Sequence, residues 1–296
     1  MFQIRERDFS YTKRQIANNL FDIKFDSPVN TFNKKNDTVH CLLKDIENKD
    51  KICILLHGLG MHATSKWDES IQYIPEGMGA CAIDLPYHRH RKTEIDLLSA
   101  FKDGIFSLNF FRQGVLDIIR TIDLVKGLGY REINIIGISL GSFFALMSMG
   151  VDKRINKGVL LLSGGDQGII TWKSPAMIKI RKQHIKEGTT RDLCLKCRSF
   201  FDDFLHSIKD GNLPSEVKSD VICFYFDTLS FAPLVDPKKI LMINALFDII
   251  IPRESTIKLH KILKEPLLKW IPAGHLSLFI FRKKIISYIK SFLLYH

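Results

Sequence analysis

The feature that most constrains the fold is residues 132–144, where an apolar run leads into Gly137-x-Ser139-x-Gly141 and a second apolar run follows. The pattern predicts a buried strand, a sharp turn and a helix. Glycines on both sides of Ser139 allow the strand and the helix to approach closely. The serine hydroxyl then projects from the sheet edge, beside helix N–H groups that favour negative charge. The alternative is a tight turn in which Ser139 is only a helix N-cap.

Strand-like and helix-like segments alternate around this turn. The apolar runs at residues 51–56 and 79–84 are typical of strands covered on both faces. Further strands are predicted at 158–162, 239–244 and 267–271, helices at 110–127, 252–263 and 276–294, and leading antiparallel strands at 21–25 and 38–46. This order predicts the α/β class, with a mostly parallel twisted sheet flanked by helices.

Residues 171–232 interrupt the alternation, because they are helical in character and rich in aromatic residues. We expect them to form an inserted helical cap over the carboxyl edge of the sheet, with aromatic side chains suited to an acyl or aryl pocket. These aromatic residues are Trp172, Phe200, Phe201, Phe204, Phe224, Tyr225 and Phe226. The predicted core domain is then 1–170 together with 233–296, and residues 1–20 are expected to be a polar arm or helix.

The composition is that of an ordinary globular protein, with 46% hydrophobic and 25% charged residues. A net charge of +11 is compatible with attraction to nucleic acid or anionic lipid. The lysines form no dense block, however, and no nucleic-acid-binding motif is present. We therefore expect the charge to be spread over the surface and expect no nucleic-acid partner.

No run approaches the roughly 20 apolar residues needed to span a bilayer. The segment 276–294 is apolar and basic, which fits either a membrane-surface helix or a final helix packed on the sheet, and we favour packing. The six cysteines are scattered and resemble no disulfide framework, and the charged N-terminus has no apolar signal core. These features predict a cytoplasmic protein without stable membrane insertion.

Three motifs in chain order resemble the α/β-hydrolase fold superfamily, which includes serine esterases, lipases and peptidases. Ser139 matches the nucleophile, Asp248 matches the acid on the loop after a late strand, and His275 matches the base after the last strand. The motif His57-Gly58-Leu59-Gly60 resembles the oxyanion loop. The chain departs from the family pattern at residues 84–91. In this respect it resembles a poorly characterised bacterial branch of the superfamily.

The resemblance implies a serine hydrolase that cleaves a small-molecule ester, thioester or amide through an acyl-enzyme, without a metal or other cofactor. His275 would take the proton of Ser139, and Asp248 would orient His275. Asp166 is the second candidate for the acid. Backbone N–H groups of Leu59 and Leu140 would form the oxyanion hole, while His57 would order its loop. A peptidase, an acyltransferase and a non-catalytic binding protein remain alternatives.

Two further clusters have a functional and a structural interpretation. His88, Arg89, His90 and Arg91 follow a predicted strand, where they would bind a carboxylate or phosphate of the substrate or form a solvated loop. Cys194 and Cys197 are spaced for metal or redox chemistry. A structural zinc site needs four ligands, and His184 and His206 fit no standard spacing, so we favour two cysteines on one face of the cap.

Overall fold

A computed structural model of the chain describes residues 2, 9–60, 71–208, 213–214 and 216–295. Residues 1 and 3–8 of the predicted N-terminal arm lie outside the described residues, as do 209–212 and 215 of the predicted cap. No helix in the described ranges combines the length and the apolar character that a membrane crossing requires.

Nine strands of the described chain form one sheet, in the order β1-β2-β3-β5-β4-β6-β7-β8-β9. Pairing is antiparallel from β1 to β3 and between β3 and β5, and parallel across β5, β4, β6, β7, β8 and β9. The strands are β1 (Tyr11–Ala17), β2 (Leu20–Asp26), β3 (Thr38–Lys44), β4 (Lys51–Leu56), β5 (Gly79–Ile83), β6 (Glu132–Ile138), β7 (Ile155–Leu161), β8 (Ile240–Ala245) and β9 (Leu267–Ile271). The predicted α/β class with a mostly parallel sheet is confirmed.

The two halves of the sheet differ in burial as their sequences predict. Strands β4, β5 and β8 are apolar runs that are buried along almost their whole length. Strand β3 instead alternates between buried and half-buried residues, as expected when only one face of a strand meets the core. The central parallel strands are therefore covered on both faces.

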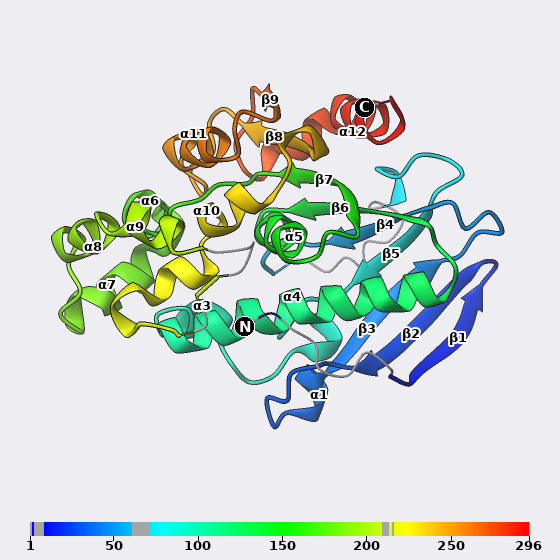
Figure 1. The fold of residues 1–296 in the computed structure, drawn as a ribbon, viewed down its shortest axis with the longest axis horizontal. Helices are drawn as coiled ribbons and strands as arrows, with labels where there is room; N and C mark the ends of the chain where they lie inside the picture. Colours follow the sequence, from blue (N-terminus) through cyan, green and yellow to red (C-terminus); the bar gives the residue numbers. More distant parts are fainter. Residues whose placement is uncertain (1, 3–8, 61–70, 209–212, 215, 296) are drawn as a thin grey trace.

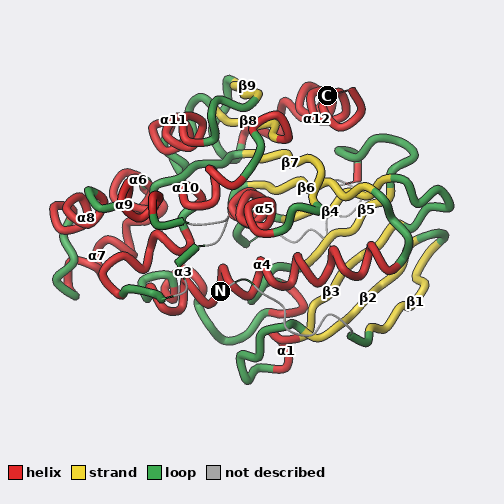
Figure 2. The backbone as a smooth tube through the Cα atoms, viewed as in Figure 1, coloured by secondary structure: helices red, strands yellow, loops and turns green. Residues whose placement is uncertain are grey.

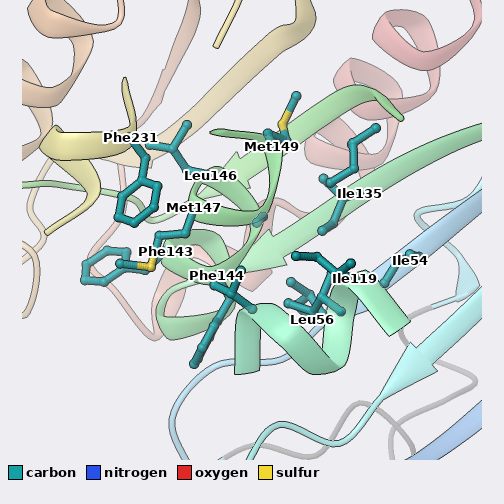
Figure 3. Close-up of a cluster of buried hydrophobic side chains, with 14 of the residues drawn as sticks. Ile54, Leu56, Ile119, Ile135, Phe143, Phe144, Leu146, Met147, Met149 and Phe231 are labelled. Atoms are coloured by element: carbon teal, nitrogen blue, oxygen red, sulfur yellow. The ribbon is translucent and has the colours of Figure 1, made fainter. Parts of the chain in front are cut away.

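Helices form layers on the two faces of the sheet (Figure 1). One hydrophobic cluster joins α4 (Gly104–Gly127) and α5 (Leu140–Val151) to one face, where Ile54 and Leu56 of β4 lie beside Ile119 and Phe144 (Figure 3). A second cluster joins α12 (Arg282–Tyr295) to the other face through the alternate residues of the same strands. The C-terminal helix therefore packs on the sheet, as the sequence favoured.

Strand β1 shows that residues 11–17 of the predicted polar arm or helix form a strand. All seven of its residues are exposed. A strand without a buried face needs no alternation of apolar and polar residues, and the sequence of β1 shows none. It pairs with β2 through the backbone, from Tyr11 opposite Phe25 to Ala17 opposite Leu20. Asn19 takes a left-handed backbone conformation, with φ of 55°, in the turn between the two strands.

Between β7 and β8 the chain forms a helical insertion from Gln167 to Phe231 (Figure 2). Its helices are α6 (Gln167–Lys173), α7 (Ile178–Lys186), α8 (Arg191–Arg198), α9 (Phe201–His206) and α10 (Thr228–Phe231), with 3-10 turns η2 (Pro175–Met177) and η3 (Ser219–Phe226). Its first helix, α6, begins at Gln167, where Asp166 caps it by accepting a hydrogen bond from the Ile169 N–H. Its treatment as a separate cap remains a prediction.

Arg198 joins the insertion to the loop that follows β7. Its guanidinium donates to Asp227 at 2.9 Å and pairs with Asp166 at 3.3 Å, and all three side chains are almost fully buried. The guanidinium also lies over the rings of Phe201 and Phe224, at 4.2 and 4.9 Å from their centroids. The insertion is thus tied to the core by a buried charge network.

Candidate active site

Ser139 occupies the turn between β6 and α5 in a strained backbone conformation, with φ of 52° and ψ of −117°. Such a conformation costs free energy for a residue with a side chain and persists only where the surroundings enforce it. Its N–H donates to the carbonyl of Leu161, at the end of the neighbouring strand β7, over 2.8 Å. The hydroxyl is half-buried and borders a cavity.

The two glycines of the motif are required by backbone packing. A Cβ on Gly137 would lie 2.2 Å from the carbonyl oxygen of Gly141, and a Cβ on Gly141 would lie 2.4 Å from the carbonyl oxygen of Leu56. Both contacts are with backbone, so neither can be relieved by moving a side chain. These glycines hold β6, α5 and β4 close together, which positions Ser139 at the end of the sheet.

His275 contacts the serine hydroxyl, and Asp248 contacts the opposite side of the His275 imidazole. His275 follows β9, and its Nε2 is 3.0 Å from Ser139 Oγ. Asp248 follows β8, and its Oδ2 is 2.7 Å from His275 Nδ1. The structure therefore brings together all three residues of the predicted triad, from loops after three different strands.

The contacts fit one arrangement of protons. An ionised carboxylate can only accept, so His275 Nδ1 donates to Asp248, and in a neutral imidazole Nε2 then accepts from the Ser139 hydroxyl. The second carboxylate oxygen of Asp248 accepts the N–H groups of Ile250 and Ile251, each over 2.8 Å. These two donors hold the carboxylate in the orientation that faces the imidazole, and His275 is then placed to remove the serine proton.

Asp166, the second candidate for the acid, lies elsewhere. Its carboxylate pairs with Arg198 and Lys258 and caps α6. These contacts show that the Asp166 carboxylate stabilises the junction between the insertion and the core. Asp248 is the carboxylate that bonds to His275.

His57 is a structural residue of the loop after β4. Its Nδ1 donates to the carbonyl of Gly58 over 2.8 Å, and its Nε2 accepts the N–H of Leu85 over 3.1 Å. The ring is therefore neutral and connects two loops at the carboxyl end of the sheet. Leu59 and Leu140 border the same cavity as Ser139, and Leu140 is the first residue of α5, where N–H groups lack an intrahelical acceptor.

A cavity of about 730 Å³ extends from Ser139 and His275 between the sheet edge and the helical insertion. Sequence reasoning missed its core side, which includes Phe111 of α4 and Phe143 of α5. Both residues follow the helical pattern of ordinary core positions, so no signal separates them from the rest of each helix. Of the aromatic residues expected to form the pocket, Trp172 and Phe226 border it.

The remaining aromatic residues of the insertion mostly form its own core. The ring of Phe224 lies 5.0 Å from Phe201 and 5.3 Å from Phe204, and Tyr225 lies 5.1 Å from Phe204. Edge-to-face contacts of this kind stabilise packing between short helices. The aromatic content of the segment therefore reflects its folding more than its cavity.

The predicted substrate contacts at residues 88–91 are not found at the cavity, because none of the described residues that border it comes from this loop. Arg91 is fully buried, donates to the carbonyls of Asn36 and Asp84, and pairs with Asp117 at 2.8 Å. His88 is also buried, with Nδ1 2.8 Å from the Pro86 carbonyl oxygen. Arg89 is half-buried outside the cavity wall. Arg91 and His88 are therefore buried away from the cavity and fasten the loop to its neighbours, whereas a substrate contact from Arg89 stays a prediction.

Cys194, Cys197 and Cys223 all border the cavity. A hydrogen bond from Cys223 lowers the pKa of the Cys197 thiol to about 7, and nearby Arg198 acts in the same direction, while burial opposes the shift. Burial raises the pKa of Cys194. Within the described residues no group of His, Cys, Asp and Glu side chains is arranged to hold a metal ion.

Alkylation should therefore select Cys197. With iodoacetamide, we expect its labelling rate to reach half its maximum near pH 7 and rise no further well above it, because the thiolate is the reacting form. Cys194 should react only at higher pH, and fully buried Cys53 should not react in the folded protein. Peptide mass spectrometry across a pH series measures all three. In Cys223→Ala, the Cys197 midpoint should move upward; a native midpoint near pH 9 would contradict the assignment.

No protein-family model matches the sequence, and no curated protein matches it. Similarity appears in the structure instead. An acetyl xylan esterase from Paenibacillus sp. R4 superposes with a TM-score of 0.63 at 14% identity, covering 96% of this chain and 89% of that chain.

Two further structures have the same arrangement. Acetyl xylan esterase 1 from Thermoanaerobacterium sp. JW/SL YS485 has a TM-score of 0.61 at 16% identity, over 96% of this chain and 88% of that one. A cold-adapted esterase from an Arctic intertidal metagenomic library has a TM-score of 0.59 at 16% identity, over 96% and 98%. At such identities the similarity establishes the fold alone. Together with the nine-stranded sheet and the strand-turn-helix at Ser139, it means that the chain has the α/β-hydrolase fold.

Proposed function

We propose that the protein is a serine hydrolase that cleaves small-molecule carboxylic esters. The observation that carries the proposal is the hydrogen-bonded line from Ser139 Oγ through His275 to Asp248, at the wall of a large cavity. Several proteins with a similar fold are esterases, which agrees with this chemistry. A serine that merely capped α5 would need neither the strained backbone nor the imidazole.

In the proposed reaction, Ser139 Oγ attacks the ester carbonyl while His275 Nε2 takes the hydroxyl proton. The negative charge on the carbonyl oxygen is stabilised by the backbone N–H groups of Leu59 and Leu140. His275 returns the proton to the departing alcohol, leaving an acyl group on Ser139. Water, deprotonated by His275, then releases the carboxylic acid and restores the serine.

Labelling with a fluorophosphonate tests the activated serine without knowledge of the substrate. We expect one adduct per molecule by intact mass on the native protein and none on Ser139→Ala. Ser142→Ala is the matched control, because its hydroxyl lies on the next turn and donates to the Ser139 carbonyl rather than to the imidazole. An unlabelled, folded native protein, or an adduct that survives in Ser139→Ala, would refute the proposal.

A further inference from the structure

The cavity beside Ser139 is far larger than an acetyl group. Its volume of about 730 Å³ falls in the range of about 300–1,000 Å³ found for sites that bury drug-sized ligands. Ser139 and His275 are part of its wall, so a group attached to the reacting carbonyl extends directly into it. A two-carbon acyl group would leave most of this space to water.

Apolar side chains from both sides form the wall. Phe111 and Phe143 contribute from the core, and Ile180 and Phe226 contribute from the insertion. Each is less than one-tenth exposed, and the rings of Phe111 and Phe226 are stacked with centroids 5.6 Å apart and planes within 4°. Figure 3 shows Phe143 on α5, beside Met147. Packing on both sides means that the wall is already formed before a ligand enters.

The charged residues at the cavity do not favour an anionic group. Lys102 is accompanied by Glu187 and Asp220, so both signs are present. Arg91, the strongest candidate for binding an anion, is buried against Asp117 instead. The cavity therefore suits a neutral apolar group.

We propose that the substrates are neutral esters whose acyl group is apolar and either long or aromatic, that this cavity binds the acyl group, and that acetyl esters are poor substrates. The inference rests on the proposed ester hydrolysis. The acyl side is the relevant one, because the acyl group stays attached to Ser139 in the acyl-enzyme and Ser139 is part of the cavity wall.

The first test compares p-nitrophenyl esters from acetyl to octanoyl, below their micelle concentrations. Each methylene that enters the cavity should raise kcat/KM about fourfold, so octanoyl should exceed butanoyl by about 10²-fold. Methyl octanoate should also be cleaved faster than octyl acetate, which carries its apolar chain on the alcohol side, and the reverse order would overturn the proposal. Equal rates along the series, or a preference for acetyl, would overturn the proposal.

The second test narrows the cavity. Ala176 borders it and is exposed, so Ala176→Trp adds a large ring with little risk to folding. We expect the octanoyl-to-acetyl ratio of kcat/KM to fall at least tenfold. Lys179→Trp is the matched control, since Lys179 is exposed on the adjoining helix α7 and does not border the cavity. Thermal denaturation checks that both variants are folded, and an unchanged ratio in Ala176→Trp would overturn the proposal.

Failure of this inference differs from failure of the proposed function. If fluorophosphonate labels Ser139 but chain length has no effect, the hydrolase stands and the substrate class is wrong. If neither labelling nor hydrolysis occurs, the hydrolase itself is wrong.

Discussion

Asp248→Asn is expected to lower kcat by about 10⁴-fold while leaving the protein folded. The amide oxygen of asparagine would keep the hydrogen bonds from the N–H groups of Ile250 and Ile251. Its NH₂ group would then face His275 Nδ1 and donate to it. That forces the proton onto Nε2, which can no longer accept the proton of Ser139. Steady-state hydrolysis of an ester that the native protein cleaves well measures the loss.

Asp166→Asn is the control for this prediction. Asp166 lies in the Arg198 network and not against His275, so its replacement should act on stability rather than on the proton transfer. Thermal unfolding of both variants separates the two effects. A larger loss of kcat in folded Asp166→Asn than in Asp248→Asn would mean that the wrong carboxylate has been assigned.

Arg91→Met should lower the free energy of unfolding by about 3–5 kcal/mol. The fully buried guanidinium pairs with Asp117 and donates to the carbonyls of Asn36 and Asp84. Removing it leaves a buried carboxylate without its cation and two carbonyls without this donor. Urea unfolding measures the change, and Arg131 provides a control, since its guanidinium is exposed and pairs with Asp50 at the surface, so Arg131→Met should change stability by about 0.5 kcal/mol or less.

The pH dependence gives this prediction a second readout. Burial already raises the pKa of Asp117, although Arg91 and the Ser27 hydroxyl oppose the shift. A carboxyl whose pKa is raised by folding destabilises the protein when ionised and loses that penalty when protonated. The deficit of Arg91→Met should therefore be largest at neutral pH and shrink as the pH falls. Adding Asp117→Leu to Arg91→Met should recover much of the stability; unchanged stability with weaker binding of anionic esters would restore the substrate role.

The sequence predicts the parallel half of the sheet well because its strands are apolar on both faces. The run at residues 51–56 coincides with β4, and the turn at Ser139 lies between strand and helix as its glycines require. The order of the motifs predicts that Asp248 and His275 lie on loops after the late strands. Their meeting point is not in any local pattern, since it depends on the parallel register of β8 and β9 with the strands beside them.

What the sequence does not predict depends on partners that are distant in the chain. Strand β1 is polar and exposed, so it is recognised by its pairing with β2 and not by its sequence pattern. Arg91 looks like a solvated loop residue until Asp117, on a helix facing the sheet, is found beside it. One signal was present: Asp117 lies among the apolar positions Val115 and Ile118, where an isolated charge implies a buried partner.

The position of the helical insertion between two directly paired strands affects how the protein can evolve. Strands β7 and β8, which flank it, pair directly from Gly158 with Ile240 to Leu161 with Ile243. Mutations, insertions or gene recombination within residues 167–231 can therefore remodel the far wall of the cavity without moving the strand ends that carry Ser139, Asp248 and His275. A lineage with this architecture can acquire new substrates while it inherits the proposed reaction unchanged.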